Sequence, residues 1–416
     1  MKTVRAVLLL LAVAACSDAT NPVVPPPPPP FTAHVAYCAG NEPRWVAFQD
    51  GSGAWTPALP EASNGRVVFT HTFLSDRGAI ATAFEPGGGF TGLVLLYGTP
   101  QELETRGVTN PRFCSAGTNT LQGSVAGLSG NDFAAVWGGF FVQSVVLDNV
   151  NFALDRVAPG PRDFLATRVT RVPDGDSVAG IILRRGVDLP NGATLPVFDF
   201  TSAEAFQPDA RQLSLGGRDL NGTVVATRFI TGSLDLPLSL TVTQHAGTTV
   251  PYPSIPESRL LPGDLQVVQA QTHASNNLLV ATLYYRTPLD RALDVGAPMI
   301  PPQLSTVATL PTLRVRARFL PQGEYNQQTS ISYQQDQTIV GIAMTAAYAG
   351  LTGGYDMQIP ELSGVANFNS AWALHGPVEL RWTASRIGGT LGLGIDAIPV
   401  DGTVQRSAST IDVFTP

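Results

Sequence analysis

Residues 66–73 read Arg66-Val-Val-Phe-Thr-His-Thr-Phe73, a run of β-branched and aromatic residues. Such residues favour β-strands, and along the chain apolar positions recur with a period of two far more often than with a helical period. Similar runs follow at residues 90–97, 224–230, 278–286, 313–319, 339–348 and 378–385. The sequence therefore predicts a body built from many short strands.

Turn-forming pairs separate these runs. They are Asp50-Gly51, Asn64-Gly65, Asp174-Gly175, Asn191-Gly192, Asn221-Gly222 and Asp401-Gly402. Such pairs favour tight turns between neighbouring strands, and many short strands with these turns are typical of sandwiches and barrels. We predict an all-β protein with several consecutive β-sandwich domains of the Ig-like kind. A β-propeller is the alternative, although no repeat of equal length is evident.

Helix signals are few and short. Thr99-Pro-Gln-Glu102 has a cap, a first-turn proline and a capping-box glutamate, and Gly107 offers a stop. Thr201-Ser-Ala-Glu204 repeats this pattern and is ended by Pro208. Rossmann, TIM-barrel and α/β-hydrolase folds need long helices between strands, so this pattern excludes them.

The first 16 residues have the layout of an export signal. Lys2 and Arg5 precede an apolar run over residues 6–13, which is too short to span a bilayer, and small residues lead to Cys16. Val13-Ala-Ala-Cys16 resembles the lipobox of bacterial lipoproteins. The resemblance implies that residues 1–15 are cleaved off and that Cys16 receives lipid, which anchors the protein to a membrane without a spanning helix. An ordinary cleaved signal is the alternative.

A proline-rich linker follows over residues 16–31. Ser17 resembles the residue that directs lipoproteins to the outer membrane, so we expect the body in the periplasm or at the cell surface. Pro25 to Pro30 are six consecutive prolines, which in polyproline II extend roughly 19 Å as a stiff spacer. The alternative is a ligand for a proline-recognising domain.

Two cysteines remain in the body, Cys38 and Cys114. In an exported chain such a pair predicts a disulfide, here closing a β domain over residues 32–117. The loop would stabilise the fold by roughly 4 kcal/mol in the chain-entropy model. The alternative is a pair of buried free thiols. Neither cysteine has a second Cys or His at the spacing of metal ligands.

The rest of the chain divides into three further segments. We expect a β-sandwich over residues 118–208, a β domain over 209–300 and a C-terminal β domain over 301–416. Leu121-Gln-Gly-Ser-Val-Ala-Gly127, with residues 150–154 and 157–166, resembles the carboxypeptidase regulatory-like, or transthyretin-like, β-sandwich. In that family the module is accessory rather than catalytic.

Composition and motifs exclude several function classes. The net charge is −7, and Lys2 is the only lysine, so nucleic acid is not expected as a partner. Once the signal is removed, no lysine remains for Schiff-base or P-loop chemistry. The five histidines lack metal-ligand spacing, and no Gly-x-Ser-x-Gly motif occurs. We predict no catalytic residue, no metal site and no cofactor.

Two segments are candidates for ligand binding. In residues 313–319 the alternation places Arg314, Arg316 and Arg318 on one face, where they could hold an acidic polysaccharide or a phosphate-bearing lipid. The alternative is an exposed face with carboxylates opposite. Residues 322–337 carry many amides beside Tyr325 and Tyr333, a combination that suits sugars. The alternative is a neutral face in contact with solvent.

These observations favour a non-enzymatic, membrane-anchored envelope lipoprotein. Its role would be display, or binding of glycan, envelope polymer or another protein. An envelope hydrolase directed at glycan is an alternative, because two carboxylates assembled between domains suffice for glycoside cleavage. A structural subunit of an envelope assembly is a further one, and it would expose an apolar patch or an unpaired edge strand.

Overall fold

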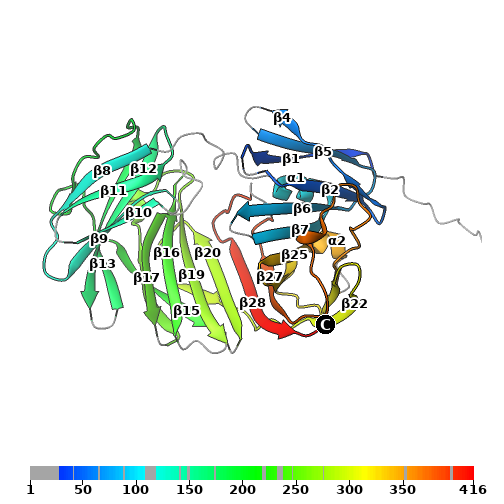
Figure 1. The fold of residues 1–416 in the computed structure, drawn as a ribbon. Helices are drawn as coiled ribbons and strands as arrows, with labels where there is room; N and C mark the ends of the chain where they lie inside the picture. Colours follow the sequence, from blue (N-terminus) through cyan, green and yellow to red (C-terminus); the bar gives the residue numbers. More distant parts are fainter. Residues whose placement is uncertain are drawn as a thin grey trace, which may run out of the picture.

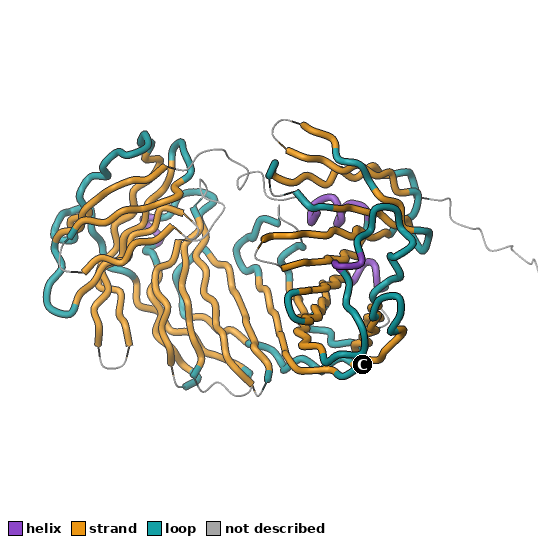
Figure 2. The backbone as a smooth tube through the Cα atoms, viewed as in Figure 1, coloured by secondary structure: helices purple, strands orange, loops and turns teal. Residues whose placement is uncertain are grey.

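The computed structural model describes residues 28–416, apart from 41, 64–65, 88–89, 108–118, 140–141, 148–149, 173–174, 218–221, 232–237, 246, 275, 351–353 and 394–396. Strands make up most of this part of the chain (Figures 1 and 2), so the all-β prediction is confirmed. Cys16 and Cys114 lie outside the described residues. The signal, the lipid anchor and the Cys38–Cys114 disulfide therefore remain predictions.

A 12-stranded sheet is the main layer of the molecule (Figure 1). From edge to edge its strands are β17 (Leu238–His245), β16 (Thr223–Ile230), β19 (Leu265–Ala274), β20 (Asn277–Tyr285), β28 (Val404–Phe414), β27 (Leu380–Gly389), β24 (Gln328–Gln335), β25 (Thr338–Thr345), β7 (Phe90–Gly98), β6 (Gly78–Gly87), β2 (Trp45–Asp50) and β3 (Trp55–Pro57).

Distant parts of the chain meet in this sheet. Strand β25 pairs in parallel with β7, with Ile342 opposite Leu95, which joins the C-terminal and N-terminal parts of the chain. Strand β28 pairs antiparallel with β20, with Ala408 opposite Leu279. One hydrogen-bonded ladder thus runs through three of the segments that the sequence pattern separated, 32–117, 209–300 and 301–416.

Two three-stranded sheets form the second layer of a sandwich. Hydrophobic residues of both layers share one core cluster, which includes Leu279 and Tyr333 of the large sheet and Leu213 and Val315 of the smaller ones. The smaller sheets are β18 (Thr249–Ser254), β15 (Asp209–Gly216) and β21 (Arg291–Asp294), and β22 (Gln303–Ala308), β23 (Arg314–Phe319) and β26 (Tyr355–Gln358). A propeller would need repeated four-stranded blades, and the described sheets do not have that pattern.

Arg386 lies fully buried on the core side of β27. Its Nη1 donates to Oε1 of Gln322 at 2.9 Å, its Nη2 donates to the Leu320 carbonyl, and its guanidinium lies 5.3 Å from the centre of the Phe319 ring. Burial lowers the pKa of this arginine. The side chain ties the segment between β23 and β24 to the large sheet.

The N-terminal residues add a small layer to the other face of the large sheet. Strands β1 (Phe31–Cys38), β5 (Arg66–Phe73) and β4 (Glu61–Ser63) form a sheet whose core residues pack against Val46, Phe48 and Ile80. Helix α1 (Pro100–Gly107) packs beside β1 and begins with the expected capping box. The Thr99 nitrogen donates to Glu102 at 2.9 Å, and the Glu102 nitrogen donates back to the Thr99 hydroxyl at 3.2 Å.

Residues 119–206 form a second, separate sandwich core. Its two sheets are β10 (Val142–Leu147), β9 (Asp132–Gly139), β12 (Arg162–Val172) and β13 (Gly175–Val187), and β11 (Asn151–Val157), β8 (Asn119–Ala126) and β14 (Phe198–Asp199). The expected helix at Thr201–Glu204 is wrong. The segment forms turns instead, in which the Asp199 carbonyl accepts hydrogen bonds from both the nitrogen and the hydroxyl of Ser202.

The other helical segments within the described residues are short: α2 (Ala346–Ala349), η2 (Glu257–Arg259) and η3 (Ser370–Trp372). Helix α2 begins where the strand expected over residues 339–348 stops, since β25 ends at Thr345. Cys38 is buried at the end of β1. No helix within the described ranges is long and apolar enough to cross a membrane.

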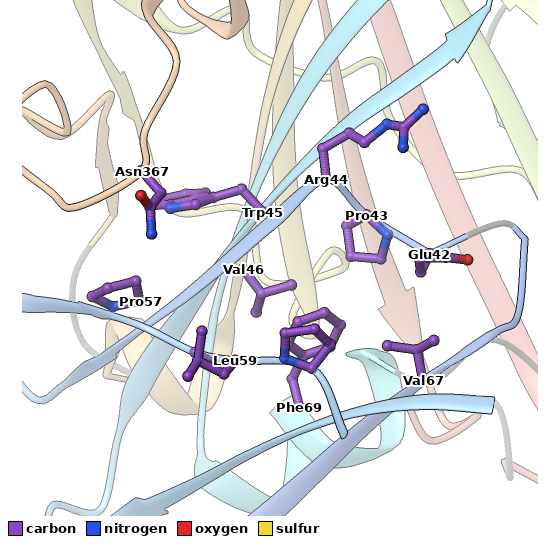
Figure 3. Close-up of a pocket in the computed structure, with 12 residues that line it drawn as sticks. Glu42, Pro43, Arg44, Trp45, Val46, Pro57, Leu59, Val67, Phe69 and Asn367 are labelled. Atoms are coloured by element: carbon purple, nitrogen blue, oxygen red, sulfur yellow. The ribbon is translucent and has the colours of Figure 1, made fainter. Parts of the chain in front are cut away.

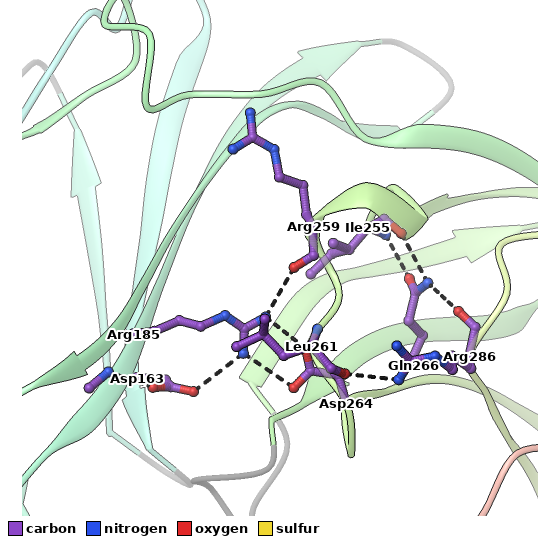
Figure 4. A network of polar contacts seen from close by, with 9 residues as sticks. Asp163, Arg185, Ile255, Arg259, Leu261, Asp264, Gln266 and Arg286 are labelled. Carbon is purple, nitrogen blue, oxygen red and sulfur yellow. Dashed lines mark hydrogen bonds and ion pairs between the residues drawn. The ribbon is translucent and has the colours of Figure 1, made fainter.

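An arginine joins the second sandwich to the rest of the molecule (Figure 4). Nη2 of Arg185 on β13 donates to Asp264 Oδ2 at 2.7 Å and to the Arg259 carbonyl at 3.1 Å, and Nη1 lies 3.7 Å from Asp163. Both carboxylates are almost fully buried. The Arg185 guanidinium lies 5.6 Å from the centre of the Phe229 ring, which belongs to an apolar cluster with Ile181.

We expect Arg185→Ala to lower the free energy of unfolding by about 3–5 kcal/mol, because it leaves two buried carboxylates without their cation. Chemical denaturation of the full chain measures this change. Arg381→Ala removes an exposed arginine and should change stability by less than about 0.5 kcal/mol. Equal stability of the two variants would show that the Arg185 contact does not stabilise the interface between the second sandwich and the rest of the molecule.

Candidate binding site

The arginine row on β23 lies as the alternation predicted. Leu313, Val315, Ala317 and Phe319 are buried, whereas the side chains of Arg314, Arg316 and Arg318 lie on the opposite face and keep between 22% and 58% of their surface exposed. Strand β23 pairs with β22 on one side and with β26 on the other.

Carboxylates lie opposite this row, which was the alternative stated for it. Both Nε and Nη2 of Arg316 donate to Asp356, the former at 2.6 Å, and Nε of Arg318 lies 3.6 Å from the same carboxylate. Arg314 lies 3.5 Å from Glu361. The hydrogen bond from Arg316 lowers the pKa of Asp356. An acidic ligand would have to displace these carboxylates.

Tyr325 and Tyr333 do not present their rings to a ligand. Both are core residues, with 1% and 0% of their surface exposed. The Tyr325 hydroxyl donates to the Ala297 carbonyl at 2.6 Å. Tyr333 on β24 and Tyr325 in the loop before it both point into the core, which corrects the hypothesis that their rings bind a ligand. The Gln335 amide binds the backbone of a distant segment: it donates to the His375 carbonyl and accepts from the His375 nitrogen, 40 positions along the chain.

A groove of about 500 Å³ lies in the N-terminal part of the molecule (Figure 3). We call it the Trp45 groove. It lies where the chain leaves β3, the edge strand of the large sheet, and enters β4, the edge strand of the small one. Its lining residues are Glu42, Pro43, Arg44, Trp45, Val46, Pro57, Ala58, Leu59, Pro60, Val67, Phe69 and Asn367.

Buried residues from both faces of β2 line the Trp45 groove: Val46 and Phe69 belong to the cluster shared with the small N-terminal sheet, and Trp45 belongs to the main core. Trp45, Val46 and Phe69 are at most 5% exposed. The indole nitrogen of Trp45 donates to the Ala366 carbonyl at 3.1 Å, and its ring packs edge-on against Phe368 at 5.3 Å between ring centres. These contacts hold the Trp45 ring in place before any ligand arrives.

The walls of the groove are apolar and rigid. Pro43, Pro57 and Pro60 have fixed backbone φ angles and little side-chain freedom to lose on binding. Leu59, between two of the walls, exposes 80% of its surface. A preformed apolar groove of this size matches the usual form of a ligand site, and its rigidity reduces the entropic cost of binding.

Few polar groups lie at the mouth. Arg44 lies 3.6 Å from Glu85, and Figure 3 shows its side chain pointing away from Leu59 and Phe69. Glu42 lies at one end, and Asn367 lies beside the Trp45 ring at the other. Asn367 can donate and accept hydrogen bonds.

The sequence pattern did not reveal this groove. Prolines flanking a Trp-Val-Ala-Phe strand were a signal, because proline cannot continue a sheet ladder and so marks edges. Asn367, however, comes from a loop more than 300 positions away and had no signal.

The described residues contain no group of three or more His, Cys, Asp or Glu placed to hold a metal ion. No protein-family model matches the chain, and no curated protein matches it.

The lowered pKa of Asp356 makes stability depend on pH. Since the folded value lies below the ordinary 3.8, the carboxylate contributes stability above that pH and loses it as pH falls through the lowered pKa. Asp356→Asn should flatten this acid-side loss, measured as thermal midpoints between about pH 6 and about pH 2.5. Asp188→Asn, at an exposed position on another module, is the control. Identical curves for Asp356→Asn and the unaltered protein would contradict the expectation.

Proposed function

We propose that this protein is a non-enzymatic, lipid-anchored envelope module that displays a preformed binding groove. The Trp45 groove is the observation that carries the proposal, since its lining combines apolar side chains, among them the fixed Trp45 ring, with three prolines. Its lining is mostly apolar, which favours an apolar ligand, such as a segment of an envelope protein, over a free sugar.

The arginine row supports a glycan-binding role less well. Each of its three guanidiniums already lies close to a carboxylate, so binding an acidic polymer there replaces existing ion pairs. The groove needs no such exchange. Its floor and walls need only lose water, which is the favourable step in apolar binding.

The export layout supports the anchor. Lys2, Arg5, the apolar run and Cys16 occur in the order of a lipoprotein signal, and the prolines after them suit a stiff spacer. Pro28 to Pro30, the described end of that spacer, are exposed just before β1. A spacer there would hold the small N-terminal sheet, and with it the groove, away from the membrane.

Leu59→Asp should weaken binding of the neutral apolar dye Nile red by about tenfold, because a carboxylate then stands at the apolar mouth. The readout is a fluorescence titration of the full chain. Leu74→Asp changes another strongly exposed leucine, one that does not line the groove, and should leave the titration unchanged. Equal weakening by both variants would place the dye elsewhere and refute the groove as its site.

The anchor has its own test. Cys16→Ala should abolish incorporation of a palmitate analogue in a bacterial host and move the protein out of the membrane fraction, because the lipid-accepting thiol is gone. Ser17→Ala should still be labelled. Unchanged labelling of Cys16→Ala would refute the anchor and leave the groove proposal standing.

A further inference from the structure

We propose that His71 makes the attachment of the small N-terminal sheet acid-sensitive: protonation of its imidazole loosens the packing of β1 and β5 on the large sheet. The second sandwich and the rest of the large sheet keep their packing. This inference goes beyond the proposed binding function and requires no ligand.

His71 lies on the face of the small sheet that packs against the large sheet (Figure 1). The alternation along β5 places Val67, Phe69 and Phe73 on this same face. Phe69 and Phe73 belong to one core cluster with Phe48 of the large sheet, and Val67 packs against that cluster. His71 is thus an ionisable side chain in an otherwise apolar row between two layers.

Aromatic rings enclose the His71 ring. It stacks on Phe48 with 4.9 Å between ring centres and planes 5° apart, and it lies edge-on to Phe73 at 4.7 Å. Its Nε2 atom is buried and has no hydrogen-bond partner among the described residues. A neutral imidazole leaves one ring nitrogen without a proton, whereas an imidazolium carries N–H groups on both nitrogens. Protonation therefore places a charged donor at Nε2 without an acceptor.

One carboxylate faces His71 from the large sheet. Asp50 follows Phe48 by two positions on β2, and it accepts hydrogen bonds from the Leu74 and Ser75 nitrogens at 2.8 and 2.9 Å. Burial lowers the pKa of His71, and the charge of Asp50 opposes this with a smaller effect. The neutral imidazole is therefore the form that suits the packed layers.

The other elements around the ring present apolar side chains to it. Ala33 of β1 lies opposite His71, and Ile80 of β6 and Leu103 of α1 belong to the adjoining cluster. Tyr37, a further ionisable group on this face, lies opposite Val67, and burial raises its pKa.

The nearby charged groups have other positions or partners. Arg66 and Glu61 lie on the other face of the small sheet. The two glutamates of α1 accept hydrogen bonds elsewhere, Glu102 from the Thr345 hydroxyl and Glu104 from the His34 nitrogen. In the turn after β5, the side chains of Asp76 and Arg77 lie 3.7 Å apart.

The lowered pKa sets the direction of the effect. When the layers open, the His71 ring regains water and binds a proton more readily than in the packed state. The contribution of His71 to the packed state is therefore fully present above about pH 6.5, the ordinary histidine value, and is lost as pH falls from there through the lowered pKa.

Hydrogen exchange of the full chain, followed by mass spectrometry at about pH 7.5 and about pH 5, measures the opening. Intrinsic exchange rates change with pH, so each variant is compared with the unaltered protein at the same pH. His71→Phe keeps an aromatic ring on Phe48 but cannot be protonated. The rates of β1 and β5 amides in the unaltered protein, divided by those in His71→Phe, should be at least about threefold higher at the acid pH than at the neutral pH.

Two further variants separate charge from packing. His71→Gln removes the stacked ring and should loosen β5 at both pH values, but it should show no additional loss in acid because glutamine does not titrate. His34→Gln removes an exposed histidine from the other face of the same sheet and should retain the acid effect of the unaltered protein. Amides of β12 in the second sandwich should exchange at equal rates in all these proteins at a given pH.

Four results would overturn the inference. An equal ratio for His71→Phe at both pH values would show that His71 does not respond to acid. Loss of the acid effect in His34→Gln would assign the titration to the exposed histidine. An acid effect of the same size in β12 would mean that the whole molecule is destabilised. Slower exchange of β1 and β5 in acid, relative to His71→Phe, would mean that the Phe48 ring stabilises the imidazolium.

Discussion

The parallel pairing of β7 with β25 is the constraint on which the architecture depends. Backbone N–H and C=O groups in a buried sheet must find partners, and each of these central strands finds half of its partners in a segment about 250 residues away. This pairing places the N-terminal strands at one end of the large sheet. The pairing of β20 with β28 joins the strands from the middle of the chain to the same sheet. One core cluster then spans both layers, so the segments share a sandwich.

The buried cations of the folded part are arginines, because Lys2 is the only lysine in the sequence. Arg185 satisfies two buried carboxylates at the joint between the sandwiches, and its planar fork reaches Asp264 with two nitrogens. Arg386 has no such carboxylate within the described contacts and instead uses Gln322, the Leu320 carbonyl and the faces of Phe319 and Tyr355. The charge of an arginine is delocalised over its guanidinium and is weakly hydrated, which makes both buried arrangements possible. The compact ammonium group of a lysine is more strongly hydrated and would lose more on burial.

The groove exists because the chain changes sheets at Pro57–Pro60. Strand β3 ends one sheet edge and β4 begins the other, and the short connection between them cannot cover Trp45 and Phe69 completely. Among the described strands, β4 pairs with β5 alone.

Short sequence patterns predicted the features that depend on neighbouring residues, namely the bounds of strands and the start of a helix. The run at residues 66–73 predicted β5 with both ends correct, and Thr99 with Glu102 predicted the start of α1, since cap and strand signals act over a few residues. The alternation in residues 313–319 also placed the arginines on one face correctly. Only the tertiary structure decided that carboxylates lie opposite them, that Tyr333 points into the core, and that Trp45 and Asn367 meet. These depend on strand order and register, which are set by contacts between residues far apart in the chain, and no local pattern encodes them.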